Sequence, residues 1–560
     1  MKCTMPKFAG GWKMAISKFV GLGMIVAFLV LTPKLSEAGT HKKIDKTVTR
    51  AVLSNGLHVI IVRNPIAPVV ATVVNYKVGS NEAPHGFPGM AHAQEHMMFR
   101  GNPGLSAGQL ANITAAMGGM FDADTQQSVT QYFFNIPSQY LDVALRIEAI
   151  RMSGVLDSEK LWRKERGAIE QEVARDYSSP EYIFYTRLLA AMFKGTPYSH
   201  DALGTHASFE QTTGPMLKKF YDTWYAPNNA TLIIVGDVHP QDVLKMIKKR
   251  FGNIPAKKLP PRPSVRLEPI KPETIRLKSD LPYGLAIIAF RLPGYDSPDY
   301  AASQVLGDVM NSHRGDLYQL GVDGKVLSAD FSLDTFPRAG LGYAVAAYPK
   351  DGRVNKVLKN LRSVLGSYIK NGVPVDLVEA AKRQELASAE FQKNSVFGLS
   401  MAWSQALAVE GRRSPEDDLE AISRVSAADV NRVARRYLDL DHAVVAVLTP
   451  EASGKPASAQ NNMGIEKVAL PQNRNVVLPE WAKRALKRLS VPASKLSPVV
   501  KALPNGIKLI VQPESISHTV SVYGHVKNNP YLQTPPGKEG VDRAGRHVDR
   551  YKPVPRLPEM

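Results

Sequence analysis

Two histidines and a glutamate with the spacing of a metal site lie in one short segment, residues 90–99, which reads MAHAQEHMMF. His92 and His96 are four residues apart, so on a helix both imidazoles project from one face and are close enough to share a metal ion. Glu95 lies between them in space, where a carboxylate is better placed to take a proton from water than to bind the metal. The segment therefore predicts a zinc site with its own general base.

The residues around this motif favour a buried site. The reversed order H-x-x-E-H is known from metallopeptidases. Met90, Met97, Met98 and Phe99, together with two alanines, make the predicted helix apolar nearly all round. Histidine and glutamate side chains in such surroundings must be paired or bound to a cation to offset their lost hydration. The alternative is a pair of core histidines that is hydrogen-bonded to Glu95 without a metal.

A catalytic zinc takes three protein ligands and leaves one position for water, so a third ligand is needed. The single cysteine, Cys3, precedes an apolar N-terminal run, which leaves His, Asp and Glu to hold the metal. Glu165 and Glu172 are seven residues apart on one apolar stripe of a helix predicted for 157–176, whereas Glu170 points elsewhere. On spacing alone, an ordinary solvated helix rich in glutamate is an equal alternative.

These residues need a scaffold, and the flanking segments predict strands that alternate with helices. Residues 51–62 (AVLSNGLHVIIV) predict a hairpin with an Asn-Gly turn. We expect further strands at 69–78 and 230–238, and helices at 86–100, 106–117, 138–152, 157–176 and 239–250. After a proline-rich stretch at 255–272, strands are expected at 284–291, across 325–348 and at 444–448, and helices at 299–310, 355–371 and 375–392.

A repeat with a period of about 450 residues indicates duplication. The ten residues that begin at Leu53 (LSNGLHVIIV) match the ten that begin at Leu503 (LPNGIKLIVQ). We predict a zinc-binding domain at 45–258 and a second homologous domain without a metal site at 270–452. A linker at 453–500, with a short helix after its polar part, leads to a truncated start of a third repeat at 501–540 and an unstructured tail at 541–560.

The N-terminal residues 1–38 read as an export signal. Four lysines precede an apolar run at 19–31, and Ser36-Glu37-Ala38 is an acceptable cleavage site. The run is shorter than the roughly 20 residues of a spanning helix, and we expect no stable membrane span after cleavage. The predicted location is periplasmic or secreted. The formal net charge is +19, but the basic residues are spread along the chain, so we expect no nucleic-acid partner.

The motif His92-Ala-Gln-Glu95-His96, followed some 75 residues later by Glu172, resembles the pitrilysin/insulinase family of inverted zinc peptidases, which includes the mitochondrial processing peptidases. Further matching segments are Glu165-Arg166, Asp124-Thr125, Tyr132, Pro197-Tyr198 and the run FYDTWYAPNNA that begins at Phe220. The resemblance covers residues 48–540. It implies α+β fold class, with tandem homologous domains that each pack a mostly antiparallel or mixed sheet with helices.

The resemblance also implies the roles of the site residues. His92, His96 and Glu172 would bind one Zn²⁺ per chain, Glu95 would be the general base, and Glu165 would be a supporting acid. Two features depart from the family. Asp122-Ala123 stands where an Asn-Ala pair commonly holds the substrate backbone, and the stretch 317–327 lacks the Arg and Tyr, seven apart, that the family supplies from the opposite half.

Two hypotheses about function follow. The first is a zinc endopeptidase that cleaves peptides or unfolded polypeptides by metal-activated water. The second is a non-catalytic or inactive binding subunit, which keeps the metal site and needs a second half for activity. The expected partners are a peptide or unfolded protein substrate and either a second copy of the chain or a complementing second-half polypeptide.

Overall fold

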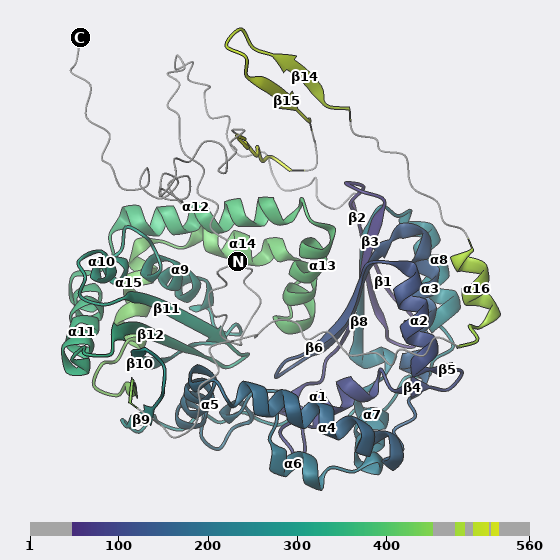
Figure 1. Cartoon of the computed structure of the whole chain (residues 1–560), viewed down its shortest axis with the longest axis horizontal. Helices are drawn as coiled ribbons and strands as arrows, with labels where there is room; N and C mark the ends of the chain where they lie inside the picture. The colour runs from purple at the N-terminus through teal and green to yellow at the C-terminus, as the bar shows by residue number, and fades with distance from the viewer. Residues whose placement is uncertain (1–46, 452–475, 488–496, 514–516, 526–560) are drawn as a thin grey trace, which may run out of the picture. The chain divides into compact units, whose positions relative to one another are not determined.

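The computed structural model describes residues 47–451, 476–487, 497–513 and 517–525; the predicted signal peptide and the predicted tail lie outside these ranges. The first part of the chain is built on a six-stranded sheet with the order β1-β2-β8-β3-β7-β6 (Figure 1). In this sheet β2 and β8 pair in parallel, and all other neighbours pair antiparallel. The sheet is therefore mixed, which confirms the predicted fold class.

The elements of this first domain have the following bounds. Its strands are β1 (Val48–Val52), β2 (His58–Arg63), β3 (Val69–Tyr76), β6 (Met120–Thr125), β7 (Thr130–Pro137) and β8 (Ala230–Gly236), with a small ribbon of β4 (Gly101–Asn102) and β5 (Leu105–Ser106). Its helices are α1 (Met90–Met97), α2 (Ala107–Met117), α3 (Leu141–Ser153), α4 (Glu159–Asp176), α5 (Pro180–Met192), α6 (His206–Gln211), α7 (Gly214–Trp224) and α8 (Pro240–Phe251).

The hairpin of β1 and β2 forms at the predicted Asn-Gly turn. Gly56 has φ +84, a conformation that glycine adopts without strain. The side-chain amide of Asn55 donates to the carbonyls of Phe251 and Ile254, at 2.8 and 2.9 Å, and so ties the turn to the end of α8. The central strands β3 and β8 are mostly apolar with almost every residue buried, which requires cover on both faces of the sheet.

Helices of the first domain cover one face of this sheet. Side chains of α1, α3, α4, α7 and α8 pack with inward residues of the strands in one large apolar core. Within that core, Trp162 and Ile169 of α4 are fully buried, and the indole of Trp162 donates to the carbonyl of Thr212 at 2.7 Å. The metal-site helix α1 and its neighbour α4 are thus positioned by packing on both sides.

The second domain repeats this architecture, which confirms the prediction of tandem homologous domains. Its five-stranded sheet has the order β11-β12-β10-β13-β9, and β13 pairs with β9 in parallel, as β8 does with β2. Its strands are β9 (Thr274–Lys278), β10 (Tyr283–Pro293), β11 (Ser328–Thr335), β12 (Ala339–Pro349) and β13 (Val444–Thr449). Its helices are α9 (Tyr300–Met310), α10 (Asp316–Val322), α11 (Val354–Asn371), α12 (Val375–Gln392), α13 (Val396–Ser404), α14 (Pro415–Arg424) and α15 (Ala427–Tyr437).

Each domain covers the outer face of the other domain's sheet with one helix. Val396, Met401 and Trp403 of α13 pack on the first sheet, on residues such as Ile60 and Val73 that face away from the first domain's own helices. In the same way, α5 of the first domain packs on the second sheet in a core that includes β10 and β12. The two domains therefore share two apolar cores.

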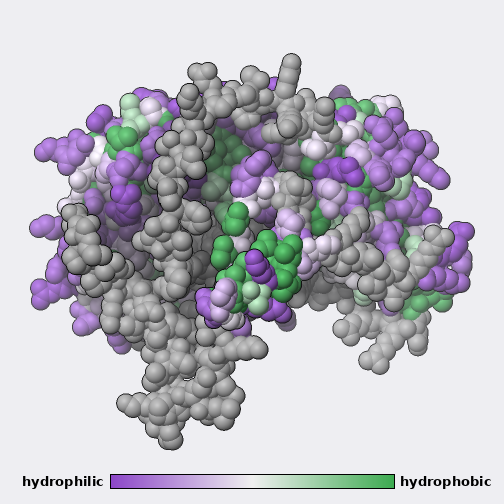
Figure 2. Space-filling model, turned by 90° about the horizontal axis from the view of Figure 1, so that it is seen from above, coloured by the Kyte–Doolittle hydropathy of each residue, from purple (hydrophilic) through white to green (hydrophobic). Residues whose placement is uncertain are grey.

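Two further elements follow the second domain. The range predicted as a linker contains the helix α16 (Glu480–Leu486). The guanidinium carbon of Arg146 lies 4.5 Å from the ring centroid of Trp481 in this helix. The strands β14 (Val499–Ala502) and β15 (Lys508–Val511) form a separate hairpin whose apolar side chains are exposed (Figure 2); Ile510, for example, is 59% exposed. Among the described residues, no helix combines the length and the apolarity needed to cross a bilayer.

Candidate metal centre

The helix α1 carries the first part of the site. It begins after the Pro88-Gly89 break, and all eight of its residues are buried. His92 and His96 lie one turn apart with Nε2 atoms 3.2 Å from each other and ring planes at 83°. Both histidines are 7% exposed. The two imidazoles therefore project from one face of α1, as the sequence predicts.

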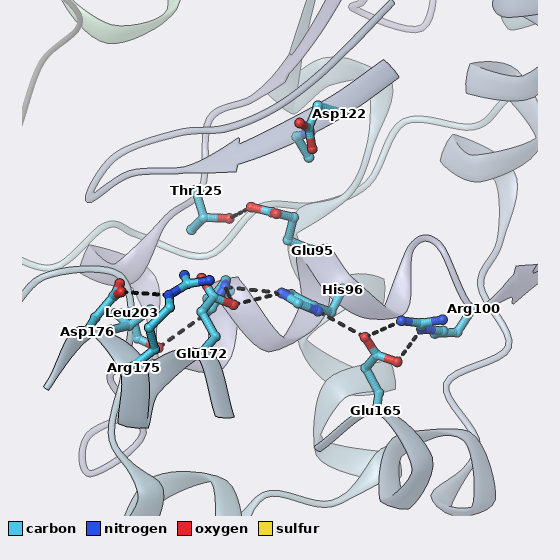
Figure 3. A network of polar contacts seen from close by, with 12 residues as sticks. Glu95, His96, Arg100, Asp122, Thr125, Glu165, Glu172, Arg175, Asp176 and Leu203 are labelled. Atoms are coloured by element: carbon cyan, nitrogen blue, oxygen red, sulfur yellow. Dashed lines mark hydrogen bonds and ion pairs between the residues drawn. The ribbon is translucent and has the colours of Figure 1, made fainter. Parts of the chain in front are cut away.

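The helix α4 supplies the two carboxylates that the sequence singled out. Its N-cap residue is Ser158, whose hydroxyl accepts the amide hydrogen of Leu161. Glu172 Oε2 lies 3.4 Å from His92 Nε2 and 3.5 Å from His96 Nε2, whereas Glu165 Oε1 lies 2.9 Å from His96 Nδ1 on the far side of the ring (Figure 3). The structure thus brings one atom each of His92, His96 and Glu172 within 4.8 Å of one another and leaves Glu165 behind His96.

The outer nitrogens of the two imidazoles have acceptor partners. His92 Nδ1 lies 3.0 Å from the carbonyl oxygen of Leu203, and His96 Nδ1 lies 2.9 Å from Glu165. A carbonyl or a carboxylate only accepts, so these partners favour the tautomer with the proton on Nδ1. Both Nε2 lone pairs then face each other and Glu172, and three acceptor atoms meet at one point.

This donor set fits zinc. A tetrahedral ion with bonds of about 2.0–2.1 Å would hold its ligand atoms about 3.3 Å apart. The three separations here are 3.2, 3.4 and 3.5 Å. Two neutral imidazoles, each with an outer hydrogen bond, and one carboxylate are a common catalytic zinc set.

The electrostatics of the site favour positive charge. Burial lowers the pKa of His96, but hydrogen bonds with Glu165 and Glu172 outweigh it and raise that pKa to about 10. Burial likewise lowers the pKa of His92, and the charge of Glu172 outweighs it, so that the net change is upward. The carboxylates around the imidazoles therefore stabilise a proton there, and by the same attraction a metal cation.

Glu95 lies apart from the three converging atoms. Its Oε2 accepts the hydroxyl hydrogen of Thr125 on β6 at 2.5 Å, and its side chain reaches toward the sheet in Figure 3. Burial raises the pKa of the Glu95 carboxyl, although the nearby imidazoles lower it in part. A carboxyl with a raised pKa, held beside the candidate metal ligands, suits a general base that works near neutral pH.

Glu165 is held by a cation as well as by His96. The guanidinium of Arg100 binds both of its oxygens, with Nη2 2.6 Å from Oε1. Burial raises the pKa of Glu165, but the hydrogen bonds from His96 and Arg100 outweigh it, so the pKa is lowered. Glu165 is therefore an anion behind His96.

Two other residues named in the sequence analysis, Asp122 and Glu170, are not among the three converging ligands. Asp122 is buried on β6, where its Oδ1 accepts the amide hydrogen of Ala123 at 3.0 Å. Glu170 points away from the centre and pairs with Arg166 and His206. The sequence did not indicate the partners Leu203 and Arg100, and Thr125 was named only as a segment that matches the family, without its contact to Glu95. A backbone carbonyl such as that of Leu203 leaves no signature in residue type.

Comparison with known proteins gives matches over both domains. The family described as Insulinase (Peptidase family M16) matches residues 58–206, and the one described as Peptidase M16 inactive domain matches residues 213–385. The chain is 28% identical to the zinc protease PqqE of Helicobacter pylori over 309 residues, which are 52% of this chain and 67% of that protein.

Two solved structures have the same fold. The crystal structure of a protease from Helicobacter pylori has a TM-score of 0.67 at 23% identity and covers 72% of this chain and 99% of that one. The periplasmic protease PqqL from Escherichia coli has a TM-score of 0.63 at 18% identity, and the match covers 84% of this chain but 55% of that one.

Proposed function

Because this chain belongs to the insulinase family, peptidase family M16, we propose that it is a zinc-dependent endopeptidase that cleaves peptides or unfolded polypeptides. The observation that carries the proposal is the convergence of His92, His96 and Glu172, with Glu95 held beside them and outside the set. A purely structural metal site would have no use for the separate buried carboxyl.

In this proposal His92, His96 and Glu172 hold one zinc ion per chain. A zinc ion bound there would supply a Lewis acid for a peptide carbonyl and would lower the pKa of bound water. Glu95 accepts the proton of the attacking water and later passes it to the departing amine. Thr125 holds the acceptor oxygen of Glu95 in place, and Glu165 keeps the ring of His96 oriented.

An unfolded substrate is favoured by the position of β6. This strand is last in the order of the first sheet, and Thr125 at its end contacts the general base. The backbone groups on the outer edge of β6 are not paired with another strand of the described residues. An extended peptide can add to such an edge by main-chain hydrogen bonds, whereas most backbone groups of a folded protein are already paired. The export signal read at residues 1–38 supports a periplasmic or secreted location for this activity.

A second candidate is a binding subunit that needs a complementing polypeptide, or a second copy, for activity. The hairpin β14–β15 supports it, because its turn repeats that of β1–β2. Gly56 and Gly506 both have φ +84, and Leu53 and Leu503 donate to the carbonyls of Leu57 and Ile507 at 2.9 and 2.8 Å. In the first domain the equivalent hairpin is continued by four more strands of the same sheet, and helices pack on that sheet.

One variant separates these candidates. Glu95→Gln should keep one zinc per chain, because Glu95 is outside the ligand set, and should lower cleavage of unfolded casein by at least about 100-fold, because an amide cannot accept the proton. Zinc content is measured by atomic absorption and cleavage by fluorescence release. Cleavage at the wild-type rate by Glu95→Gln would refute the endopeptidase mechanism. A zinc-loaded wild-type chain without any cleavage would favour the binding subunit.

A further inference from the structure

The loop between the short turn Pro197–Ser199 and α6 holds the outer nitrogen of His92. Leu203, the middle residue of this loop, supplies the carbonyl oxygen that lies 3.0 Å from His92 Nδ1, although the two residues are 111 positions apart in the chain. His96 is supported differently, by the anionic Glu165 and its partner Arg100. The orientation of the first imidazole therefore depends on how firmly this loop is fixed.

Asp201 fixes the loop from within. One carboxylate oxygen, Oδ1, accepts the amide hydrogen of Leu203 at 3.2 Å, in the same peptide segment whose carbonyl holds His92. The other oxygen, Oδ2, accepts the hydroxyl hydrogen of Tyr182 on α5. Tyr182 in turn stacks edge-on against Tyr177, the residue that ends α4, with 5.1 Å between ring centres. Asp201 thus connects the Leu203 peptide to the helix that carries Glu172.

A close backbone contact fixes the same loop to the start of α1. A Cβ atom on Gly204 would lie 2.5 Å from the Cα of Gly89, and Gly204 has φ +87. The ring of Phe209 packs over this contact, because a Cβ atom on either glycine would lie within 2.7 Å of its Cζ atom. Gly89 is the residue immediately before α1. The loop therefore touches both the helix that carries His92 and the ring of His92 itself.

We propose that Asp201 is a positioning residue for zinc: through the Leu203 peptide it holds the His92 imidazole in the orientation that the metal requires. The inference rests on the zinc site of the proposed function. The hydrogen bonds of the Asp201 side chain go to Leu203 and Tyr182, so Asp201 acts on the geometry of His92 through Leu203. Its charge also acts on His92, and the variant Asp201→Asn, which removes the charge and keeps the acceptor, separates the two effects. Removal of a group that hydrogen-bonds a ligand directly commonly costs about 10- to 100-fold in metal affinity; Asp201 acts one residue further out, through Leu203, so we expect the lower end of that range.

The test compares zinc affinities of the full chain and its variants by competition with a chromophoric chelator. Asp201→Ala loses both contacts and should bind zinc about 10-fold more weakly. Asp201→Asn keeps an acceptor for the Leu203 amide and should restore affinity to within about threefold of wild type. The matched control is Asp439→Ala, because Asp439 also orders a loop, accepting from the amides of Asp441 and His442, but does so in the second domain. That control should bind zinc as wild type does.

Three outcomes are decisive. If Asp201→Ala and Asp439→Ala bind zinc with equal affinity, the positioning role is overturned. This holds whether or not the metal-free variants have a lower Tm. A wild-type chain that binds no zinc overturns the proposed function instead, so the two failures are distinguishable. Should Asp201→Ala not fold, Tyr182→Phe replaces it, since it removes one hydroxyl from the Asp201 anchor. A several-fold loss of zinc affinity in that variant supports the role, and an unchanged affinity overturns it.

Discussion

The buried carboxyl of Asp334 should make the contact between the two domains sensitive to pH. Asp334 lies on β11 and is 6% exposed, and it faces Tyr185 of α5, the first-domain helix that covers the second sheet. Burial raises its pKa from 3.8 to about 7, and the hydroxyl of Tyr185 offsets this only in part. Its Oδ2 atom has no hydrogen-bond partner within the described part of the chain. The charged form is thus poorly compensated.

The size of the effect follows from the two pKa values. The native state keeps its proton up to about pH 7, whereas the unfolded chain releases it near pH 3.8. Between these values the native state binds more protons, so the free energy of unfolding falls as pH rises, by about 1.4 kcal/mol per pH unit. Over the roughly three pH units involved, ionisation of Asp334 costs up to about 4 kcal/mol. Below pH 3.8 this cost is absent.

The variant Asp334→Asn removes the ionisation while keeping an acceptor for Tyr185. Its Tm should match wild type near pH 3.5 and exceed it by roughly 10 °C at pH 8, because the full cost of about 4 kcal/mol is present there and about 1 kcal/mol corresponds to about 2–4 °C in a domain of this size. Thermal unfolding is followed by circular dichroism at both values. Asp330→Asn is the matched control, since it removes an exposed carboxylate from the same strand. A Tm difference between Asp334→Asn and wild type that does not grow with pH would refute the argument.

Three further outcomes are expected. Glu172→Ala should lose zinc while Glu170→Ala keeps it, because Glu172 faces both imidazoles and Glu170 pairs elsewhere; zinc analysis showing the reverse would contradict the third ligand. Removal of zinc by a chelator should lower the Tm, by the equivalent of about 4 kcal/mol when free zinc had been 1,000 times its Kd, and added zinc should restore it. Trypsin should cut the hairpin 499–511 before it cuts either domain, since a two-stranded hairpin with exposed faces is marginally stable. Mass spectrometry identifies the first cleavage site, and early cuts within 48–449 would contradict this prediction.

The strands and helices predicted from hydrophobic periodicity were found, but several elements with a clear pattern were not predicted, such as β7, α7, α14 and α15. The helix predicted at 86–100 is shorter, Met90–Met97, because Pro88 and Gly89 delay its start. The strand β6 (MFDADT) was not predicted, since Asp122 and Asp124 have little tendency to form strands, and it forms by pairing with the apolar β7. The helices α5 and α13 were also missed, and both pack on the sheet of the other domain.

For the site, residue types and spacing were enough to place His92, His96 and Glu95 together. Spacing alone did not separate Glu172 from Glu165, because both lie on one stripe of α4; the resemblance to a family assigned their roles, and the structure puts Glu172 against the Nε2 atoms and Glu165 against Nδ1. The support of His92 by Leu203 could not be predicted, since it depends on a backbone group from a loop 111 residues away.

The packing of α13 has a consequence for how such genes can recombine. The proline-rich stretch 255–272 separates the domains in sequence, yet α13, far beyond it, supplies Trp403 and Met401 to the first sheet. The hydroxyl of Ser404 also donates to Asn75 at 2.5 Å and accepts from Gln131 at 2.8 Å. A crossover within 255–272 would replace all of these contacts at once. We therefore expect the first and second domains to be inherited as one unit, and substitutions on the outer face of the first sheet to be matched in α13.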